Sequence, residues 1–256
     1  MKPDLEQNRA RLKCALCLYE VRLQRSHIIP EFLYKRMYDD KHRFHILSAV
    51  KELDDKMAQK GFRENLLCEK CETKLSRWED YACKAIYGGK ELTIEKIGRV
   101  IEVRDVDYAK MKLFQLSILW RAGVSKLEFF KRVDLGIHEE RLRQMLLLEQ
   151  PGQDYEYGCL VFGLTDYEGN TASELIVQPN PVRMGSHNGY RFVFGGFSWN
   201  YVVTSHRPKE PFTIGFLTTS GIMRFIRKNI FEADFMREFG EQRSLQRKVK
   251  VGRGFD

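Results

Sequence analysis

The sequence lacks any long run of apolar residues. No stretch of its 256 residues approaches the roughly 20 consecutive apolar residues that a membrane-spanning helix needs. The opening residues, Met-Lys-Pro-Asp-Leu-Glu-Gln, contain no apolar signal region either. Internal repeats and low-complexity segments are also missing, apart from a basic tail. We therefore expect a cytoplasmic protein without a membrane partner, whose 43% apolar content suffices for a core.

The chain also lacks the cysteine pattern of a disulfide framework. It has six cysteines, and four of them occur in two Cys-x-x-Cys pairs. In a chain of this size without an export signal, such pairs are more typical of a metal site than of disulfides. The remaining two, Cys83 and Cys159, are expected to be small buried apolar residues.

The two cysteine pairs predict a structural zinc site. They are Cys14 with Cys17 and Cys68 with Cys71. Each pair places two sulfurs on one side of a tight turn, and two such turns can close a tetrahedral four-thiolate site. We therefore expect one Zn²⁺ held by these four residues.

Positive charge exceeds negative charge. The 43 Lys and Arg against 35 Asp and Glu give a formal net charge of +8, which favours a polyanionic partner. Many of the basic residues surround the cysteine pairs: Arg9, Arg11, Lys13, Arg22, Arg25, Lys35, Arg36, Lys41 and Arg43. A solvated basic tail follows at residues 243–253.

Apolar spacing and capping residues predict several helices. The two strongest run from Cys71 to Ile86, ending at Gly88-Gly89, and over residues 105–123. Others are expected at 31–38, 49–59, 138–149 and 221–239. Residues 42–47 read as a strand or a loop, and 94–103 as a short mixed segment.

Runs rich in β-branched and aromatic residues predict strands. One leads from Tyr19 through Leu23 towards Ser26-His27-Ile28-Ile29, and five follow at 158–164, 174–177, 190–194, 199–203 and 212–216. The fold class is therefore α+β, with a C-terminal, mostly antiparallel sheet. We place a domain boundary near residue 90, between a zinc domain at 1–90 and a second domain at 91–256. The second domain holds helices within 105–150, a β-rich part at 155–217, and a C-terminal helix with the basic tail.

Residues 14–87 resemble the HNH endonuclease superfamily. The resemblance lies in the first cysteine pair, the Ser26-His27-Ile28-Ile29-Pro30 run after a short strand, Asn65 before the second pair, and a helix opening on that pair. It implies a ββα-metal, treble-clef fold with a four-cysteine structural zinc.

The resemblance also implies roles for individual residues. His27 would be the general base, Asn65 the residue that orients the histidine-bearing loop, and Glu72 a ligand for a catalytic Mg²⁺ or Mn²⁺. The implied activity is metal-dependent hydrolysis of DNA phosphodiester bonds, with RNA left open as a substrate. A bacterial defence or mobile-element setting would suit such a module.

This sequence departs from the family pattern in two places. Ser26 stands where the family has an acidic or histidine metal ligand, and Asn65 lies closer to Cys68 than the family's asparagine does. Glu72, or a residue of the following loop, would then supply the missing ligand; the loop candidates are Asp39, Asp40, His42 and His45. His27 is otherwise a histidine that supports the cysteine turns.

Two other readings of the function remain open. The chain is either a non-catalytic zinc module that binds nucleic acid or protein, or an effector nuclease that a partner activates. Phosphate contacts are expected from four basic residues beside His27 or on the second-pair helix: Arg25, Lys35, Arg36 and Lys74. The domain at 91–256 has no assigned role and offers a site for a protein partner or for self-association.

Overall fold

The computed structural model describes residues 12–47, 56–172, 175–233 and residue 236. The chain forms two compact units, and each unit is assembled from separate segments. Unit 1 comprises residues 1–30, 61–91 and 107–152, and unit 2 comprises residues 31–60, 92–106 and 153–256. Among the described residues, no helix is both long enough and apolar enough to cross a membrane.

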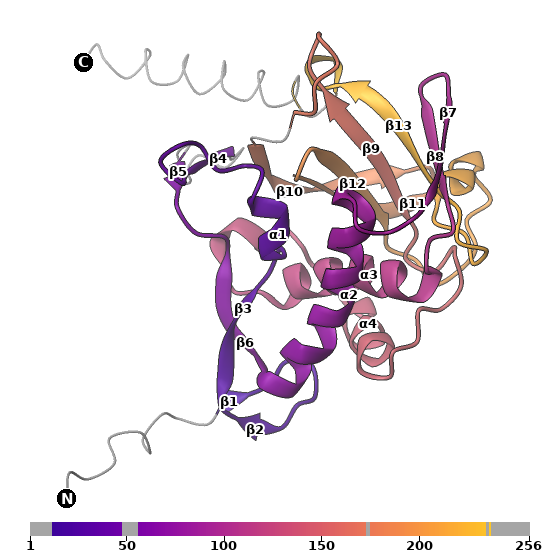
Figure 1. Ribbon diagram of the computed structural model, residues 1–256. Coiled ribbons are helices and arrows are strands. Elements are labelled where there is room, and N and C mark those ends of the chain that lie inside the picture. Colours follow the sequence, from indigo (N-terminus) through magenta and orange to yellow (C-terminus); the bar gives the residue numbers. More distant parts are fainter. Residues whose placement is uncertain (1–11, 48–55, 173–174, 234–235, 237–256) are drawn as a thin grey trace, which may run out of the picture. The chain divides into compact units, whose positions relative to one another are not determined.

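Unit 1 is built on a strand hairpin that runs directly into a helix (Figure 1). Its first elements are β1 (Leu12–Lys13), β2 (Glu20–Val21), β3 (Leu23–His27), β6 (Arg63–Cys68) and α2 (Glu69–Tyr87). Strands β3 and β6 are antiparallel, and His27 lies opposite Arg63. Helix α2 begins directly after Cys68. The negative charges of Glu69 and Glu72 in its first turn stabilise the positive end of the helix dipole. The second cysteine pair therefore lies at the start of α2.

Helix α3 (Tyr108–Val124) forms the core of unit 1, and η1 (Glu128–Phe130) and α4 (His138–Leu147) follow it. Every residue from Met111 to Ala122 is buried, so α3 has no polar face. Asp107 caps the helix, because its carboxylate accepts a hydrogen bond from the backbone N–H of Lys110 at 3.0 Å. The backbone N–H of Asp107 donates to the hydroxyl of Tyr81 at 2.6 Å, which ties the start of α3 to α2.

Unit 2 is dominated by a nine-stranded, mostly antiparallel sheet in the order β5-β4-β10-β11-β12-β9-β13-β8-β7. The strands are β4 (Phe44–Leu47), β5 (Lys56–Ala58), β7 (Thr93–Ile97), β8 (Val100–Arg104), β9 (Cys159–Thr165), β10 (Leu175–Met184), β11 (His187–Phe194), β12 (Phe197–Val202) and β13 (Met223–Asn229). Two neighbouring pairs are parallel, β4 with β10 and β9 with β13. Short helices α1 (Glu31–Tyr34), η2 (Pro211–Gly215) and η3 (Ile230–Glu232) complete the unit.

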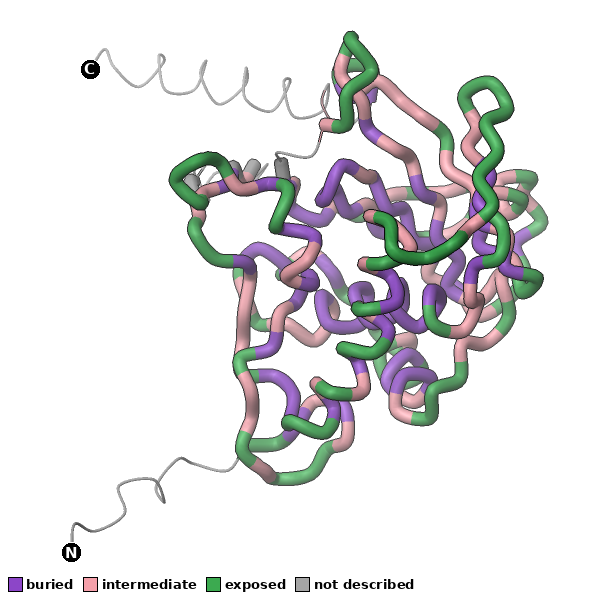
Figure 2. Tube along the Cα trace, viewed as in Figure 1, coloured by how far each residue is buried: buried purple, intermediate pink, exposed green. Residues whose placement is uncertain are grey.

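One face of the central strands carries the aromatic core of unit 2. Phe194 stacks on Trp199 with ring centroids 5.7 Å apart, and Phe192 meets Tyr201 edge-on at 5.4 Å. All four side chains are buried. The edge strand β7 is, by contrast, exposed along its whole length (Figure 2).

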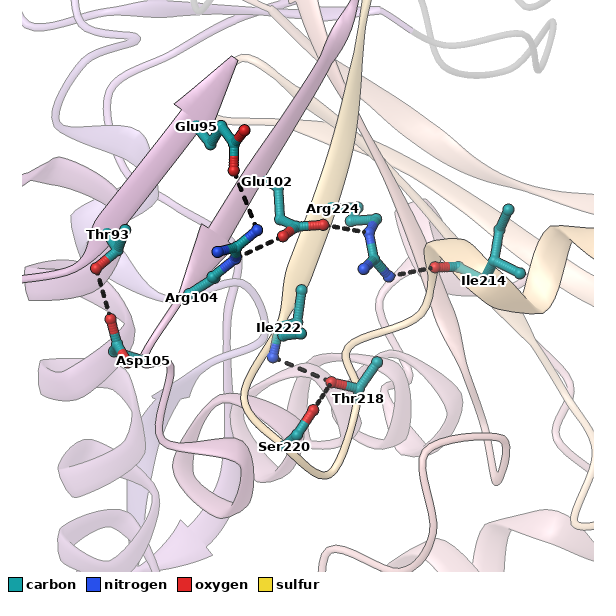
Figure 3. A network of polar contacts seen from close by, with 10 residues as sticks. All are labelled: Thr93, Glu95, Glu102, Arg104, Asp105, Ile214, Thr218, Ser220, Ile222 and Arg224. Carbon is teal, nitrogen blue, oxygen red and sulfur yellow. Dashed lines mark hydrogen bonds and ion pairs between the residues drawn. The ribbon is translucent and has the colours of Figure 1, made fainter. Parts of the chain in front are cut away.

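A network of ion pairs joins β13, β8 and β7, the three strands at one edge of the sheet (Figure 3). Glu102 is 6% exposed, and its carboxylate accepts from Arg104 Nε and Arg224 Nε, each at 2.7 Å. Glu95 lies directly opposite Glu102 on β7, and Arg104 also pairs with Glu95 at 3.0 Å. Two like charges opposite each other would destabilise the hairpin, so Arg104 removes that repulsion.

The structure confirms the mixed α+β class and the mostly antiparallel sheet. The helices expected from Cys71 to Ile86, over 105–123 and over 138–149 correspond to α2, α3 and α4. The strand runs at 158–164, 174–177, 190–194 and 199–203 fall on β9, β10, β11 and β12. The helix expected over 31–38 is present only as α1, and residues 42–47 contain the strand β4.

Other predictions of secondary structure were wrong. The strand expected at 212–216 is the 3₁₀ helix η2, which begins at Pro211. Of the helix expected over 221–239, residues 223–232 form β13 followed by η3, and residues 234, 235 and 237–239 lie outside the described residues. Strand β13 pairs with both β8 and β9, so pairing between distant segments overrides its local helical preference. The mixed segment 94–103 is the β7–β8 hairpin. Residues 56–58 of the helix expected over 49–59 form β5, and residues 49–55 lie outside the described residues.

The division of the sequence at residue 90 differs from these compact units in two places. It separates α2 from α3, which both belong to unit 1, and it assigns residues 31–60 to the zinc domain, whereas they belong to unit 2. In the structure, the hairpin-helix element at 12–30 and 61–91 is completed by α3 and α4.

The Glu102 network makes a prediction about acid stability. Arg104 and Arg224 hold the pKa of Glu102 below its ordinary value. The stabilisation is therefore complete above the ordinary glutamate pKa of about 4.3 and is lost as the pH falls through the lowered pKa. At neutral pH, Glu102→Gln should increase hydrogen exchange in β8 and β13, measured by mass spectrometry. The difference from wild type should shrink as the solution becomes acidic.

The matched control is Glu95→Gln, because Glu95 is exposed and pairs with Arg104 alone in this network. It should change exchange much less, since exposed ion pairs contribute about 0–1 kcal/mol. Equal effects of both substitutions at neutral pH would contradict a special role for Glu102.

Candidate metal centre and the adjacent hairpin

The four cysteines of the two pairs meet in unit 1. The sulfur atoms of Cys14, Cys17, Cys68 and Cys71 all lie within 4.8 Å of one another. The sulfurs of Cys17 and Cys68, from different pairs, are 3.8 Å apart. An ion about 2.3 Å from each of four tetrahedral sulfurs places them about 3.8 Å apart. The group can therefore hold a metal ion such as zinc, and its four-sulfur donor set suits that ion.

Backbone hydrogen bonds hold the two cysteine turns together. The N–H of Cys68 donates to the sulfur of Cys14 at 3.3 Å, and the N–H of Ala15 donates to the carbonyl of Leu66 at 3.0 Å. Within the first turn, Leu18 N–H donates to the carbonyl of Cys14 at 2.9 Å. The first of these bonds offsets charge on a sulfur ligand, as hydrogen bonds around metal sites do.

The sulfurs also affect one another's protonation. The hydrogen bond from the Cys71 thiol lowers the pKa of Cys14 to about 4, and the same bond raises the pKa of Cys71. Burial raises the pKa of Cys17. The group thus favours one thiolate before any ion is bound, and metal binding must displace the remaining protons.

Arg143 of α4 supports the first cysteine turn. Its Nη1 donates to the carbonyl of Leu16 at 2.5 Å, and its other nitrogens form a two-pronged pair with Glu140 at 2.7 Å. Arg143 lowers the pKa of Glu140 to about 2, so the pair stays charged at neutral pH. Sequence reasoning missed Arg143. The available signal was a basic residue within the buried stripe of α4, between Leu142 and Met145.

His27 occupies the last position of β3, and two arginines hold it. Its Nε2 accepts a hydrogen bond from Arg63 Nε at 2.7 Å, and its backbone carbonyl accepts from Arg121 Nη1 at 2.7 Å. Because Nε2 is an acceptor here, the proton of the neutral ring is on Nδ1. The imidazole is therefore fixed in one tautomer beside a guanidinium.

Arg121 joins three elements of unit 1 from inside α3. Its side chain is 1% exposed and pairs with Glu79 Oε1 of α2 at 2.8 Å. It also donates to the hydroxyl and the carbonyl of Ser117, at 3.1 and 3.2 Å. Sequence analysis predicted a helix over 105–123 and did not single out Arg121. Its signal was a cation four residues after a serine, within the apolar run of the helix.

Ser26 and Glu72 lie next to one another on the buried face of the hairpin. Ser26 is 1% exposed, and its hydroxyl accepts the backbone N–H of Leu67 at 3.0 Å. Burial raises the pKa of Glu72, while a hydrogen bond from Ser26 and the charge of Arg121 act against that rise. Glu72 Oε1 is buried and has no hydrogen-bond partner among the described residues. An orphaned carboxylate oxygen of this kind can accept a cation.

Three of the predicted site residues lie on the exposed face of the β3–β6 hairpin: Arg25, His27 and Asn65. Arg25 lies opposite Asn65, and His27 opposite Arg63. Directly opposite and alternate positions share a face, so these four side chains project to the same side, while Ser26 projects to the other. Arg25 and Asn65 are exposed. His27 and Glu72 accordingly belong to different faces of the β3–β6 hairpin.

The other predicted contact residues lie elsewhere. Lys74 Nζ donates to the carbonyl of Leu147 at 2.6 Å and lies 3.4 Å from Glu149, so it connects α2 to the end of α4. Lys35 and Arg36 are exposed in unit 2.

The loop residues weighed as extra metal ligands also belong to unit 2. Asp39 is bound by Arg43 at 2.8 Å, and His42 stacks on Tyr38 with ring centroids 3.8 Å apart. The side chain of His45 lies outside the described residues, and Asp40 is exposed. Within the part of the chain that is described, the four cysteines are the one group of three or more Cys, His, Asp or Glu ligands close enough for a metal ion.

No family model, curated protein or solved structure matches this chain.

The cysteine group predicts one zinc ion per chain. Cys71→Ala should abolish zinc binding and increase hydrogen exchange throughout β3, β6 and the start of α2. Structural four-ligand zinc sites stabilise small folds by about 10–16 kcal/mol, so the loss should be large. Zinc content is measured by elemental analysis of the purified chain. Cys83→Ala is the control, because Cys83 lies outside the group; zinc loss in that variant, or retention in Cys71→Ala, would contradict the assignment.

The Arg143 contact predicts faster loss of the metal. Arg143→Met removes the hydrogen bond to Leu16 while keeping the apolar stem, so zinc should pass to a chelator about 10-fold faster or more. The measurement is the rate of colour formation with a zinc-sensitive dye. Arg141→Met, an exposed site two residues away, should leave the rate unchanged. Equal rates for the two variants would show that Arg143 does not support the turn.

Proposed function

We propose that this chain is a metal-dependent HNH-type endonuclease that hydrolyses phosphodiester bonds of DNA. The observation that carries the proposal is the path of unit 1, in which β3 ends at His27 and β6 leads into α2 at the four-cysteine group. This path is consistent with a treble-clef, ββα-metal domain. The zinc site would hold the hairpin against the helix, and His27 would act at the end of the first strand.

His27 must be released from Arg63 before it can act as a base. In the structure Nε2, the nitrogen without a proton, is the acceptor for Arg63 Nε. A guanidinium binds a phosphate through two parallel N–H donors, which is stronger than one bond to a neutral imidazole. An incoming phosphodiester would draw Arg63 onto its oxygens, and Nε2 would become available only when substrate is present.

The released imidazole then supports hydrolysis. Nε2 takes a proton from a water molecule as the water oxygen forms a bond to phosphorus. The bond from phosphorus to the leaving sugar oxygen breaks, and that oxygen takes a proton from solvent. Arg63 remains on the phosphate, where it balances the developing negative charge. The bond from Arg121 to the His27 carbonyl holds the end of the strand during these steps.

Glu72 is the residue of this unit that fits a divalent ion. Its buried Oε1 lacks a hydrogen-bond partner among the described residues, and a carboxylate oxygen is a hard ligand suited to Mg²⁺ or Mn²⁺. Mg²⁺ commonly takes one or two carboxylates and completes its shell with water and phosphate oxygens. When bound, the ion would supply charge stabilisation at a phosphate. That phosphate must reach past the end of β3, because Glu72 and His27 lie on different faces of the hairpin.

The exposed face of the hairpin supports nucleic acid as the substrate class. Arg25 and Asn65 lie beside His27 on that face, and the chain carries a net charge of +8. Cationic and amide side chains of this kind contact phosphates without reading sequence. DNA is the first substrate to test, and RNA is the second.

A non-catalytic nucleic-acid-binding module is the competing function. The observation that favours it is the burial of Ser26, whose hydroxyl is engaged by Leu67 rather than open to an ion. A partner-activated effector nuclease is the other alternative, with unit 2 as the part that responds to the partner.

The test is cleavage of supercoiled plasmid by the zinc-loaded full-length chain, with Mg²⁺ or Mn²⁺ and without either ion. EDTA is avoided because it also removes structural zinc. His27→Ala should lower the nicking rate by about 10²- to 10⁴-fold, the usual contribution of a general base. Glu72→Gln should remove the response to added divalent ion. Both variants must retain their zinc.

His206→Ala is the matched control, because His206 is exposed in unit 2 and should not change the rate. Divalent-dependent nicking that His27→Ala leaves intact would contradict the proposed base. If wild type never cuts but binds DNA with a steep salt dependence, the binding module replaces the nuclease. Cutting that begins only when a second component is added would establish the effector.

A further inference from the structure

The first cysteine turn of unit 1 ends in an exposed aromatic side chain. Tyr19 directly follows the turn and is 73% exposed, and its ring has no stacking partner among the described residues. Leu18, the residue before it, is 41% exposed. Exposed apolar groups that lie together mark interaction sites more often than single ones do.

Backbone hydrogen bonds fix Tyr19 against the cysteine group. Its carbonyl accepts from the N–H of Cys14 at 2.9 Å, and its own N–H donates to the sulfur of Cys17. Leu18 has a φ of 65°, in the left-handed region that disfavours residues with a β-carbon. Such a conformation persists where the surrounding contacts determine the backbone. The ring of Tyr19 is therefore attached to a fixed support, and little ordering is needed when a ligand binds it.

Positive side chains accompany this ring. Lys13 of β1, Arg22 between β2 and β3, and Arg25 of β3 are exposed, and their side chains have no ion-pair or hydrogen-bond partner among the described residues. Glu20, opposite Lys13, is the one acidic residue in the sequence from 12 to 27. Three cations against one carboxylate make this surface complementary to a polyanion.

A ring beside unpaired cations matches a nucleic-acid strand with unpaired bases. Aromatic rings stack on the face of a base, while Lys and Arg contact the phosphates of the same strand. In a duplex the base faces are stacked on one another, and only their edges are exposed in the grooves. A duplex would therefore use the cations and leave Tyr19 without a role.

One strand can contact both Tyr19 and His27. Strand β2 leads into β3 through the single residue Arg22 (Figure 1). Eight residues separate Tyr19 from His27, so the two lie at most about 29 Å apart. Arg25 lies between them and shares the exposed face of the hairpin with His27. At about 3.4 Å for each stacked nucleotide, the base on Tyr19 would be roughly nine nucleotides or fewer from a phosphate at His27.

We propose that Tyr19 stacks on an unpaired base of a nucleic-acid strand whose phosphates contact Lys13, Arg22 and Arg25. The inference rests on the proposed function and deepens it, because it makes a strand with unpaired bases the preferred substrate of unit 1. The cysteine group holds the ring in place, and the cations supply affinity that does not depend on sequence.

Fluorescence anisotropy of the zinc-loaded full-length chain tests the proposal, without added divalent ion so that no strand is cut. The probes are fluorescein-labelled oligothymidine DNA, oligouridine RNA and a blunt DNA duplex, each about 12 nucleotides long, within the usual span of a single-strand site. Both single strands should bind saturably. Tighter binding of one identifies its sugar as a further contact, and equal binding shows that only the base face and the phosphates are used. Each result supports the site.

Variants locate the binding. Tyr19→Ala should weaken binding of the single strands by about 5- to 150-fold, the usual loss of one stacked base, and should leave duplex binding unchanged. Tyr19→Phe keeps the ring and should bind like wild type. Lys13→Gln should weaken binding of all three probes, because it removes a phosphate contact. Tyr167→Ala is the matched control, since Tyr167 is 76% exposed but belongs to unit 2.

Photocross-linking of wild type gives a second measurement that needs no variant. A strand carrying 5-bromodeoxyuridine is irradiated with the chain, which is then cut with trypsin. The cross-link should fall on the peptide of residues 14–22, whose one aromatic residue is Tyr19. Zinc content and unfolding midpoints of the variants are compared with wild type, so that a folding defect is recognised.

The proposal is overturned if neither single strand binds saturably, if Tyr19→Ala binds them as tightly as Tyr167→Ala, or if Tyr19→Phe loses as much affinity as Tyr19→Ala. An equal loss for the duplex, or a cross-link elsewhere, also overturns it. Plasmid nicking without binding through Tyr19 would remove this inference alone. Binding through Tyr19 without nicking would remove the nuclease and leave a module that binds single strands.

Discussion

The convergence of four cysteine sulfurs is the constraint on which unit 1 depends. Each pair closes a tight turn, but the turns are separated by residues 18–67, which include a long insertion assigned to unit 2. A short hairpin such as β3–β6 is marginally stable in water when it stands alone. Bringing both turns onto one ion would fix the hairpin ends and the start of α2 together. The insertion between the strands can then be long without disturbing their register.

Buried arginines extend this organisation away from the sulfurs. Arg143 joins α4 to the first cysteine turn, and Arg121 joins α3 to α2 and to the end of β3. Both are paired with glutamates, as a buried cation must be. The position of His27 therefore depends on a helix that begins 81 residues later in the chain, since α3 starts at Tyr108.

The features predicted correctly from the sequence are those set by the spacing of nearby residues. The Cys-x-x-Cys spacing identified the ligand group, and apolar periodicity located α2 and α3. The strand β13 was missed because its pairing with β8 and β9 depends on segments far away in the chain. The contact of Arg63 with His27 could not be predicted for the same reason. A long insertion separates the two strands, so the sequence does not fix which residue lies opposite His27. Arg121 and Arg143 lie in helices whose sequences indicate only burial.

The central claim is that four thiolates on one ion organise the hairpin and helix of unit 1. Zinc-edge X-ray absorption of the purified full-length chain tests it most directly. The account predicts a single shell of four sulfur ligands at about 2.3 Å. A shell containing nitrogen or oxygen ligands, or a zinc-free protein whose cysteines are joined as disulfides, would contradict it.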